Sequence, residues 1–310
     1  MGENHLTKRG ANKTLFGTVC GIAAAVCYGT NPFGALNLYA EGMSTNCVLF
    51  YRFGLAWLIM SVFMLFRKES LKVSWREFGV VSTLGILFIF SSLTLYLSFH
   101  LMPAGVASTI LFTYPIMTVA IMWLVYRERV GWLTLLSIVL ASVGVVLLYW
   151  TGNGQTLDIW GVVLVLISAL TYAIYIVVVG KAKLTCSSFK INWYVLLWCA
   201  IGMLVYTAIG NLAEPHSMSL TLPQTSRAWF FVVWLALVPG IAALVLMVYS
   251  SQYVGATATA ILGALEPLTA VVIGIFVFNE TFSARLAVGI ALIIAAVFFV
   301  ALSKNRNQAT

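Results

Sequence analysis

The chain has 310 residues, of which 62% are hydrophobic and only 8% are charged, and its mean hydropathy is +1.01. About a quarter of the residues of a soluble domain are charged, so this composition excludes a soluble globular protein and indicates an integral membrane protein. The formal net charge of +8 would suit nucleic acid, but the basic residues are scattered over short segments, which excludes a nucleic-acid surface. The five cysteines form no CxxC pair and predict neither a disulfide framework nor a metal site.

Apolar runs separated by short polar breaks predict ten membrane-spanning helices. A polar leader, residues 1–13, precedes the first run, and a polar tail, residues 304–310, follows the last. We interpret the first run as a span rather than a secretory signal, because further spans follow it. The predicted spans are residues 14–38, 44–66, 78–100, 103–126, 131–150, 158–180, 189–211, 228–250, 255–278 and 284–303.

The distribution of lysine and arginine predicts the orientation. With the N-terminus inside, 14 of the 17 basic residues fall in inner segments and only Arg227 and Arg285 fall in outer ones, whereas Arg52 lies within a span. This bias follows the positive-inside rule and predicts that both termini are cytoplasmic, in a multi-pass protein of the cytoplasmic (inner) membrane.

The chain contains an internal repeat. The stretch Gly255–Glu280 matches Pro103–Glu128 at an offset of 152 positions, and the match aligns Pro267 with Pro115. The first and sixth spans match at an offset of 144, which aligns Tyr172 with Tyr28. Two copies of five spans must have opposite orientations, because five is odd. We therefore predict an all-α membrane protein built from two inverted five-helix repeats, residues 14–150 and 158–303, an architecture typical of secondary transporters.

The repeated stretches also resemble a known family. The sequence A-x-x-A-S-T-I-L-F-x-Y-P that closes in R-E-R, its partner L-E-P that closes in N-E-T, and Arg52-x-x-x-Ala56 are similar to those of EamA-type transporters of the drug/metabolite transporter (DMT) superfamily. The resemblance covers residues 14–303 and implies a ten-helix bundle that moves a small metabolite by alternating access. It leaves the substrate open.

Two ionisable residues lie well inside predicted spans. At about 1.5 Å of rise per residue, Arg52 lies roughly 12 Å and Glu266 roughly 13–14 Å below the outer boundary of a core about 30 Å thick. A charge at this depth costs roughly 2.5–3.5 kcal/mol on insertion scales and marks an interior, paired or hydrated position. The sequence leaves two hypotheses open: a structural ion pair between Arg52 and Glu266, or contact of either residue with a charged substrate group or a proton.

Prolines mark candidate hinges. Pro115 and Pro267 lie in the middle of matched spans, where each removes a helical hydrogen bond. The two helices either bend at these prolines during transport, or the prolines serve packing alone. Pro32 belongs to the sequence Gly29–Gly34, which predicts either an unwound segment facing a cavity or a kink near the outer end of the first span.

Aromatic and polar residues inside spans complete a candidate substrate-binding pocket, because aromatic faces attract cations. Besides Arg52 and Glu266, the candidates are Tyr28, Asn31, Tyr96, Tyr114, Tyr172 and Trp198.

The sequence contains no signature of an enzyme. It has no Gly-rich phosphate loop, HExxH, GxSxG or paired carboxylates, so we predict no catalytic residue, cofactor or metal. The predicted partners are the lipid bilayer and a small-molecule substrate, with no prediction of oligomeric state. The predicted function is a secondary transporter that exports amino acids or related amphiphilic or cationic metabolites. A passive channel or facilitator for small polar solutes is the alternative.

Overall fold

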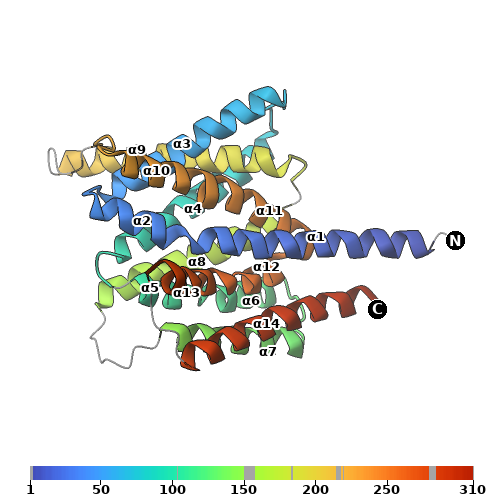
Figure 1. The fold of residues 1–310 in the computed structure, drawn as a ribbon. Helices are drawn as coiled ribbons and strands as arrows, with labels where there is room; N and C mark the ends of the chain where they lie inside the picture. The colour runs from blue at the N-terminus through green and yellow to red at the C-terminus, as the bar shows by residue number, and fades with distance from the viewer. Residues whose placement is uncertain are drawn as a thin grey trace.

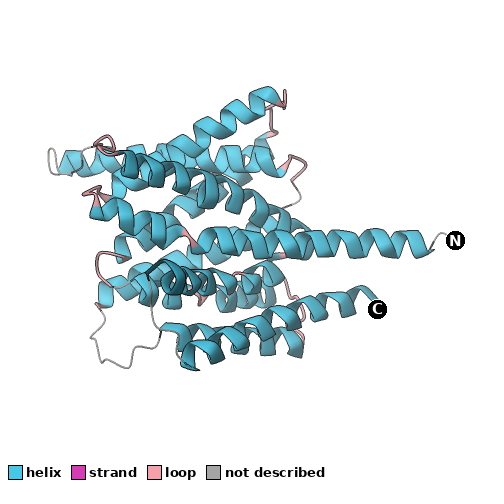
Figure 2. Ribbon diagram, viewed as in Figure 1, coloured by secondary structure: helices cyan, strands magenta, loops and turns pink. Residues whose placement is uncertain are grey.

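A computed structural model gives the fold and describes residues 3–102, 104–149, 158–182, 184–213, 218, 220–278 and 284–309. All regular secondary structure in these residues is helical, and most of the helices run along one common direction (Figures 1 and 2). The helices are α1 (Glu3–Gly29), α2 (Asn31–Ala40), α3 (Thr45–Phe66), α4 (Trp75–Ser98), α5 (Ala104–Leu111), α6 (Tyr114–Leu124), α7 (Trp132–Tyr149), α8 (Ile159–Lys181), α9 (Ser188–Ala213), α10 (Ser226–Leu235), the π-helical η1 (Ala236–Ala242), α11 (Ala243–Val254), α12 (Ala256–Leu262), α13 (Leu265–Phe278) and α14 (Ala284–Ala309).

Within these described ranges, seven helical segments are long and apolar enough to cross a membrane, and three shorter apolar helices accompany them. The seven are Lys13–Ala40, Thr45–Phe66, Trp75–Ser98, Ile159–Lys181, Ser188–Ala213, Ser226–Val254 and Ala256–Ile273. The shorter ones are Tyr114–Leu124, Trp132–Leu147 and Ala287–Phe299. Each span predicted from the sequence overlaps one of these segments, whereas the number of membrane crossings stays a prediction.

The side chains of these helices are distributed as lipid requires. Large apolar side chains such as Trp123, Leu204 and Ile209 are exposed on the outside of the bundle, where hydrocarbon rather than water would cover them. Some polar side chains of these helices are buried and bond between helices. The Ser168 hydroxyl donates to the Ser91 carbonyl oxygen at 2.7 Å, which joins α8 to α4.

Polar caps start several of the apolar helices. Ser74 and Glu77 form a reciprocal capping box at the start of α4, in which the Ser74 hydroxyl accepts from the Glu77 N–H and the Glu77 carboxylate accepts from the Ser74 N–H. Asp158 and Thr225 cap α8 and α10 in the same way, with a side-chain oxygen accepting from backbone N–H groups.

Prolines coincide with interruptions of three helical segments. The interruption at Pro115 separates α5 from α6, and Pro115 stands in the first turn of α6. The matched Pro267 stands at the start of α13, just after the break that separates it from α12. Near Pro32, Thr30 alone separates α1 from α2, so the first span has a kink rather than a long unwound segment.

The interruption in η1 was not predicted from the sequence. Pro239 lies inside this π-helical turn, where the Ala243 N–H donates to the Val238 carbonyl five residues back. The signal was available as Val238-Pro239-Gly240 in the middle of the eighth predicted span.

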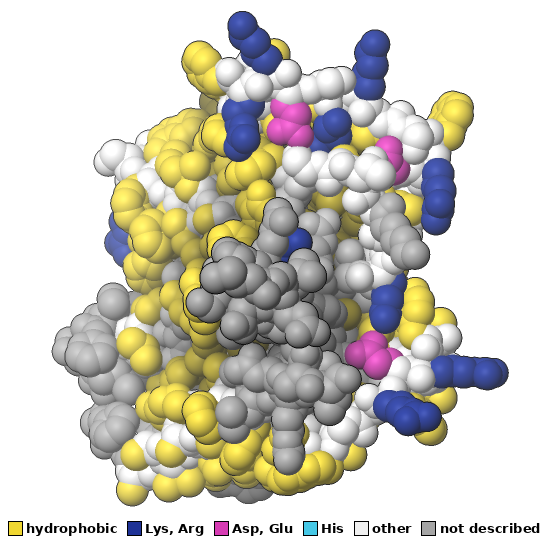
Figure 3. All heavy atoms as spheres, turned by 90° about the vertical axis from the view of Figure 1, so that its right-hand side faces the viewer, with side chains coloured by type: hydrophobic (Ala, Val, Ile, Leu, Met, Phe, Trp, Pro, Cys, Tyr) yellow, Lys and Arg dark blue, Asp and Glu magenta, His cyan; other side chains and the backbone are white. Residues whose placement is uncertain are grey.

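The packing of the helices brings the two halves of the chain together. α1 packs along α11, α4 along α8, α3 along α9, and α7 along α14, so most of the largest contacts join one half to the other. Both termini lie at the same end of the bundle (Figure 1). We call this the termini end; the loops between α3 and α4 and between α8 and α9 also lie there. Lysine and arginine side chains gather around its rim (Figure 3).

Candidate functional site

Arg52 forms the first polar cluster of the interior. Its side chain on α3 is only 2% exposed. The guanidinium donates to the Tyr96 hydroxyl at 2.9 Å, and that hydroxyl donates to the side-chain oxygen of Asn31 at 3.2 Å. A further bond of 3.4 Å runs from the Arg52 guanidinium to the Pro239 carbonyl in the π-helical turn. Three of the predicted site residues thus meet in one network, together with a proline carbonyl that the sequence analysis missed.

No carboxylate among the described residues lies within ion-pair distance of Arg52. Among the residues that the structure describes, the only ion pair joins Lys181 and Glu128, which are partly exposed near the termini end. The Arg52 guanidinium lies instead over the Phe53 ring, 5.0 Å from its centroid, and its Nε has no hydrogen-bond partner. A buried cation with neutral partners and an unused donor is suited to bind an anion.

Glu266 belongs to a second polar cluster, which surrounds a cavity of about 10 Å³. The carboxylate stands in the first turn of α13, just after the helix interruption. The predicted residues Tyr28, Tyr114 and Tyr172 line the same cavity from α1, α6 and α8. Residues from both halves of the chain therefore enclose Glu266.

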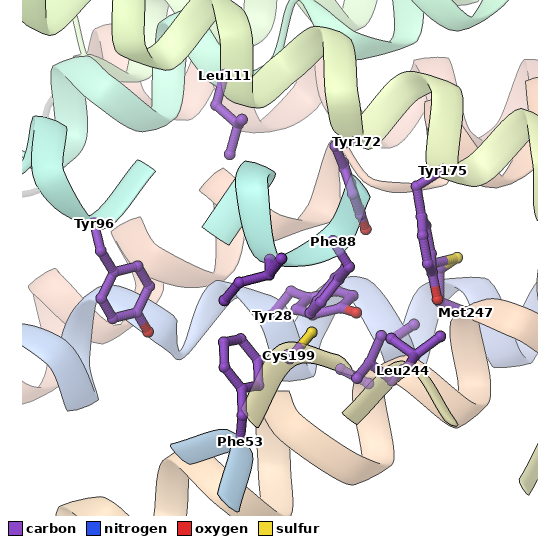
Figure 4. Packing of buried hydrophobic residues seen from close by; sticks show 14 of the residues in the cluster. Tyr28, Phe53, Phe88, Tyr96, Leu111, Tyr172, Tyr175, Cys199, Leu244 and Met247 are labelled. Carbon is purple, nitrogen blue, oxygen red and sulfur yellow. The ribbon is translucent and has the colours of Figure 1, made fainter. Parts of the chain in front are cut away.

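The aromatic rings of this cluster pack edge to face. The centroids of Tyr114 and Tyr172 are 4.9 Å apart, and those of Tyr28 and Tyr172 are 6.3 Å apart. Figure 4 shows Tyr28, Tyr172 and Phe88 gathered at the centre of the buried core, with Tyr96 to one side. Edge-to-face pairs favour a single arrangement of the rings, which gives the cavity a defined wall.

Gly263 allows the two interrupted helices to approach. The Tyr114 hydroxyl occupies the position that a Cβ atom on residue 263 would take, and Tyr114 Cζ would lie 2.8 Å from such an atom. Tyr114 opens α6, and Gly263 lies in the matching interruption between α12 and α13. The breaks of the two halves therefore contact each other beside Glu266, and a larger residue at position 263 would have to displace the Tyr114 side chain.

Arg52 and Glu266 interact electrostatically without forming an ion pair. The Arg52 charge acts on Glu266 from a longer distance, since no Arg52 nitrogen approaches the Glu266 carboxylate within 4.0 Å. The direct structural ion pair is therefore absent from this conformation. Because Arg52 bonds to Tyr96 and the Pro239 carbonyl, the two opposite charges face the same interior from separate clusters.

Trp198 joins neither cluster. Its side chain packs against Gly85 and against the Phe78 ring, whose centroid lies 6.3 Å away, so it fills the α4–α9 contact. For metal ions, the part of the chain that the structure describes contains no group of three histidine, cysteine or acidic side chains that could act as ligands.

Comparison with known proteins identifies the family. The model of the EamA-like transporter family matches residues 15–150 and again residues 159–302. An uncharacterized transporter of Archaeoglobus fulgidus is 28% identical over 62% of this chain and 65% of that protein, just under two thirds of its length. The uncharacterized transporter YcbK of Bacillus subtilis is 23% identical over 92% of this chain and 91% of that protein.

Two further matches are to a named translocator and to a solved structure. A protein of Arabidopsis thaliana named "Probable sugar phosphate/phosphate translocator" is 23% identical over 85% of this chain and 84% of that protein. A crystal structure of a protein that is 18% identical aligns with a TM-score of 0.75 over 94% of this chain and 98% of that chain. The second match shows a shared fold alone.

Proposed function

The chain belongs to the EamA-like transporter family, within the DMT superfamily, and from this premise we propose that it is a secondary transporter that exports amino acids or related amphiphilic or cationic metabolites. It is an integral multi-pass membrane protein, as its apolar helices and its transporter relatives indicate. We further propose that it resides in the cytoplasmic membrane, with both termini in the cytoplasm, and works by alternating access.

The cavity where the two interrupted helices meet is the observation that carries this proposal. Broken helices that face each other inside a membrane bundle expose backbone and side-chain polar groups to a cavity rather than to lipid. Here the breaks at Pro115 and Pro267 face each other, and the cavity beside them contains a carboxylate.

The packing supports two inverted five-helix repeats, residues 14–150 and 158–303, with ten crossings in all. In such an arrangement the first span corresponds to the sixth, and the third to the eighth. The contact of α1 with α11 then corresponds to the contact of α8 with α4, and both contacts are extensive. The double match of the family model follows the same division.

Two matched contacts at opposite ends of the bundle support alternating access. At the termini end, the Glu77 carboxylate accepts from the Thr185 hydroxyl at 2.6 Å, which joins the first turn of α4 to the α8–α9 loop. At the opposite end, the Thr225 hydroxyl donates to the Glu41 carboxylate at 2.8 Å, which joins the start of α10 to the end of α2. Glu41 and Thr185 are related by the repeat offset of 144 positions. We call these the termini-end contact and the opposite-end contact, and propose that transport opens them in turn.

The charges of the interior support a substrate with two ends. Arg52 offers hydrogen-bond donors to a carboxylate or a phosphate, whereas Glu266 among tyrosines offers a negative, aromatic environment to an amine. An amino acid carries both groups.

Exchange transport tests this function against the passive channel. In proteoliposomes loaded with an unlabelled amino acid, uptake of the labelled amino acid should saturate and should be accelerated by the internal pool. A channel gives flux that the internal pool does not accelerate, and that result with every amino acid tested would contradict the proposal.

Cysteine labelling tests the orientation. In a variant with Cys186→Ser, Gln224→Cys should react with a membrane-impermeant maleimide from outside the cell, and Lys72→Cys should react only after the membrane is opened. Residue 72 is exposed at the termini end and residue 224 lies just before α10. Labelling of both positions from one face would contradict the inverted repeat and the orientation together.

We also propose that Pro115, Pro267 and Pro32 act as hinges. Replacing Pro115 and Pro267 together with alanine should keep the protein folded and able to bind ligand but slow its exchange, because each helix would regain a hydrogen bond across its break. Exchange at the wild-type rate would assign both prolines to packing.

A further inference from the structure

We propose that the cavity lined by Tyr28, Tyr114, Tyr172 and Glu266 binds one small monovalent cation, a proton carried on the carboxylate or as hydronium, or a sodium ion. The inference rests on the proposed transport function, for which it supplies the coupling ion. The four side chains come from α1, α6, α8 and α13.

The volume of the cavity limits which ion or molecule can bind in it. A volume of about 10 Å³ admits a single water-sized particle, whereas pockets for small organic molecules measure roughly 300–1,000 Å³. A single ion therefore fits beside Glu266 in this conformation and a metabolite does not, so the ion and the substrate amine would occupy the carboxylate in turn, in different conformations.

The side chains that line the cavity favour a positively charged ligand. Glu266 has no cationic partner within ion-pair distance among the described residues, so its negative charge requires compensation inside the membrane. Tyr28 is 5% exposed, and its hydroxyl has no hydrogen-bond partner. A carboxylate and phenolic oxygens are hard ligands that suit a proton or sodium.

The surroundings of the carboxylate permit it to alternate between two charge states. The titratable groups that line the cavity with it are the three tyrosines, and Arg52 of α3 acts on it electrostatically from beyond ion-pair distance. Burial of Glu266 opposes its ionised form, whereas its position in the first turn of α13 favours that form, because a helix N-terminus is positive. Both halves of the chain line the site, so a movement of one half against the other would change the ligands of the ion, which links ion binding to the access change.

Ion binding can be measured without transport. We would follow the thermal unfolding of the purified, detergent-solubilised full chain in sodium, potassium or choline chloride at constant ionic strength, and across a range of pH. The wild type should unfold several degrees higher in sodium than in choline if sodium binds. If a proton binds, unfolding should depend on pH alone, and an infrared carboxyl band should appear as pH falls.

Glu266→Gln should abolish the dependence of the unfolding temperature on sodium or on pH that the wild type shows. The reason is that the amide cannot ionise yet keeps the shape of a protonated carboxyl. Tyr114→Phe, which keeps the ring and removes one oxygen, should weaken cation affinity about tenfold. Glu128→Gln serves as a matched control, since Glu128 forms an exposed ion pair and should leave the response unchanged.

The outcomes separate this site from the proposed function. If the change of unfolding temperature with sodium or pH is lost in Glu266→Gln and weakened in Tyr114→Phe, the result supports the cation site, even if no amino acid is exchanged in proteoliposomes. If Glu266→Gln fails to fold, the change of unfolding temperature measured for Tyr114→Phe alone tests the site. A wild-type response to cations or pH that both variants share would overturn the proposal, even if exchange is observed.

Discussion

Gly263→Ala should destabilise the protein by about 1–3 kcal/mol and abolish exchange. The added methyl group would overlap the Tyr114 hydroxyl and lie 3.0 Å from the Ala260 carbonyl oxygen. Relief requires the two interrupted helices to separate at the point where they enclose the cavity. Thermal unfolding and exchange in proteoliposomes measure the two effects.

Gly54→Ala is the matched control. Gly54 also lies within an apolar helix, but a Cβ atom there meets no atom within 4 Å, so the substitution should be neutral or slightly stabilising. Combining Gly263→Ala with Tyr114→Leu should recover part of the stability, since the overlapping hydroxyl is removed, without restoring exchange. Equal stability and equal exchange in Gly263→Ala and Gly54→Ala would contradict a close contact between the two interrupted helices at Gly263.

Glu266→Gln should remain folded and lose exchange, and Arg52→Gln should not restore it. The reason is that a protonated glutamate and a glutamine have the same shape, whereas only the carboxylate can bind a cation. Unfolding temperature and the pH dependence of exchange should be measured for each single variant and for the double variant.

A structural pair gives the opposite pattern. Removing one member of a buried pair typically costs about 3–5 kcal/mol, and removing both recovers much of that loss. Tyr96→Phe is a useful comparison, because it removes one hydrogen bond of Arg52 and leaves both charges in place. Full exchange by Glu266→Gln with unaltered pH dependence would make both residues purely structural.

The sequence predicted the helices well, because membrane spans depend on local composition. The apolar runs found the helical segments, and the repeat found the matching interruptions at Pro115 and Pro267. The same repeat pointed to Tyr28 and Tyr172, which do meet in the structure. Depth in a span and repeat position are one-dimensional properties, so the sequence could supply them.

What the sequence could not supply is the direction in which each side chain points. Arg52 and Glu266 share a depth, which suggested an ion pair, but Arg52 points to Tyr96 and the Pro239 carbonyl. Trp198 lies inside a span as the other candidates do, yet it packs on Gly85. Rotation of a helix about its axis is set by packing against neighbouring helices, which a single sequence does not reveal.

The most direct test of alternating access measures both ends of the bundle at once. Spin labels at Ser44→Cys and Gln224→Cys report on the opposite-end contact, and labels at Arg76→Cys and the native Cys186 report on the termini-end contact, each with the remaining cysteines replaced. We predict that adding an exchanged substrate moves the two distances in opposite directions, one lengthening as the other shortens. If both distances lengthen together, the protein opens a continuous path, and alternating access is contradicted.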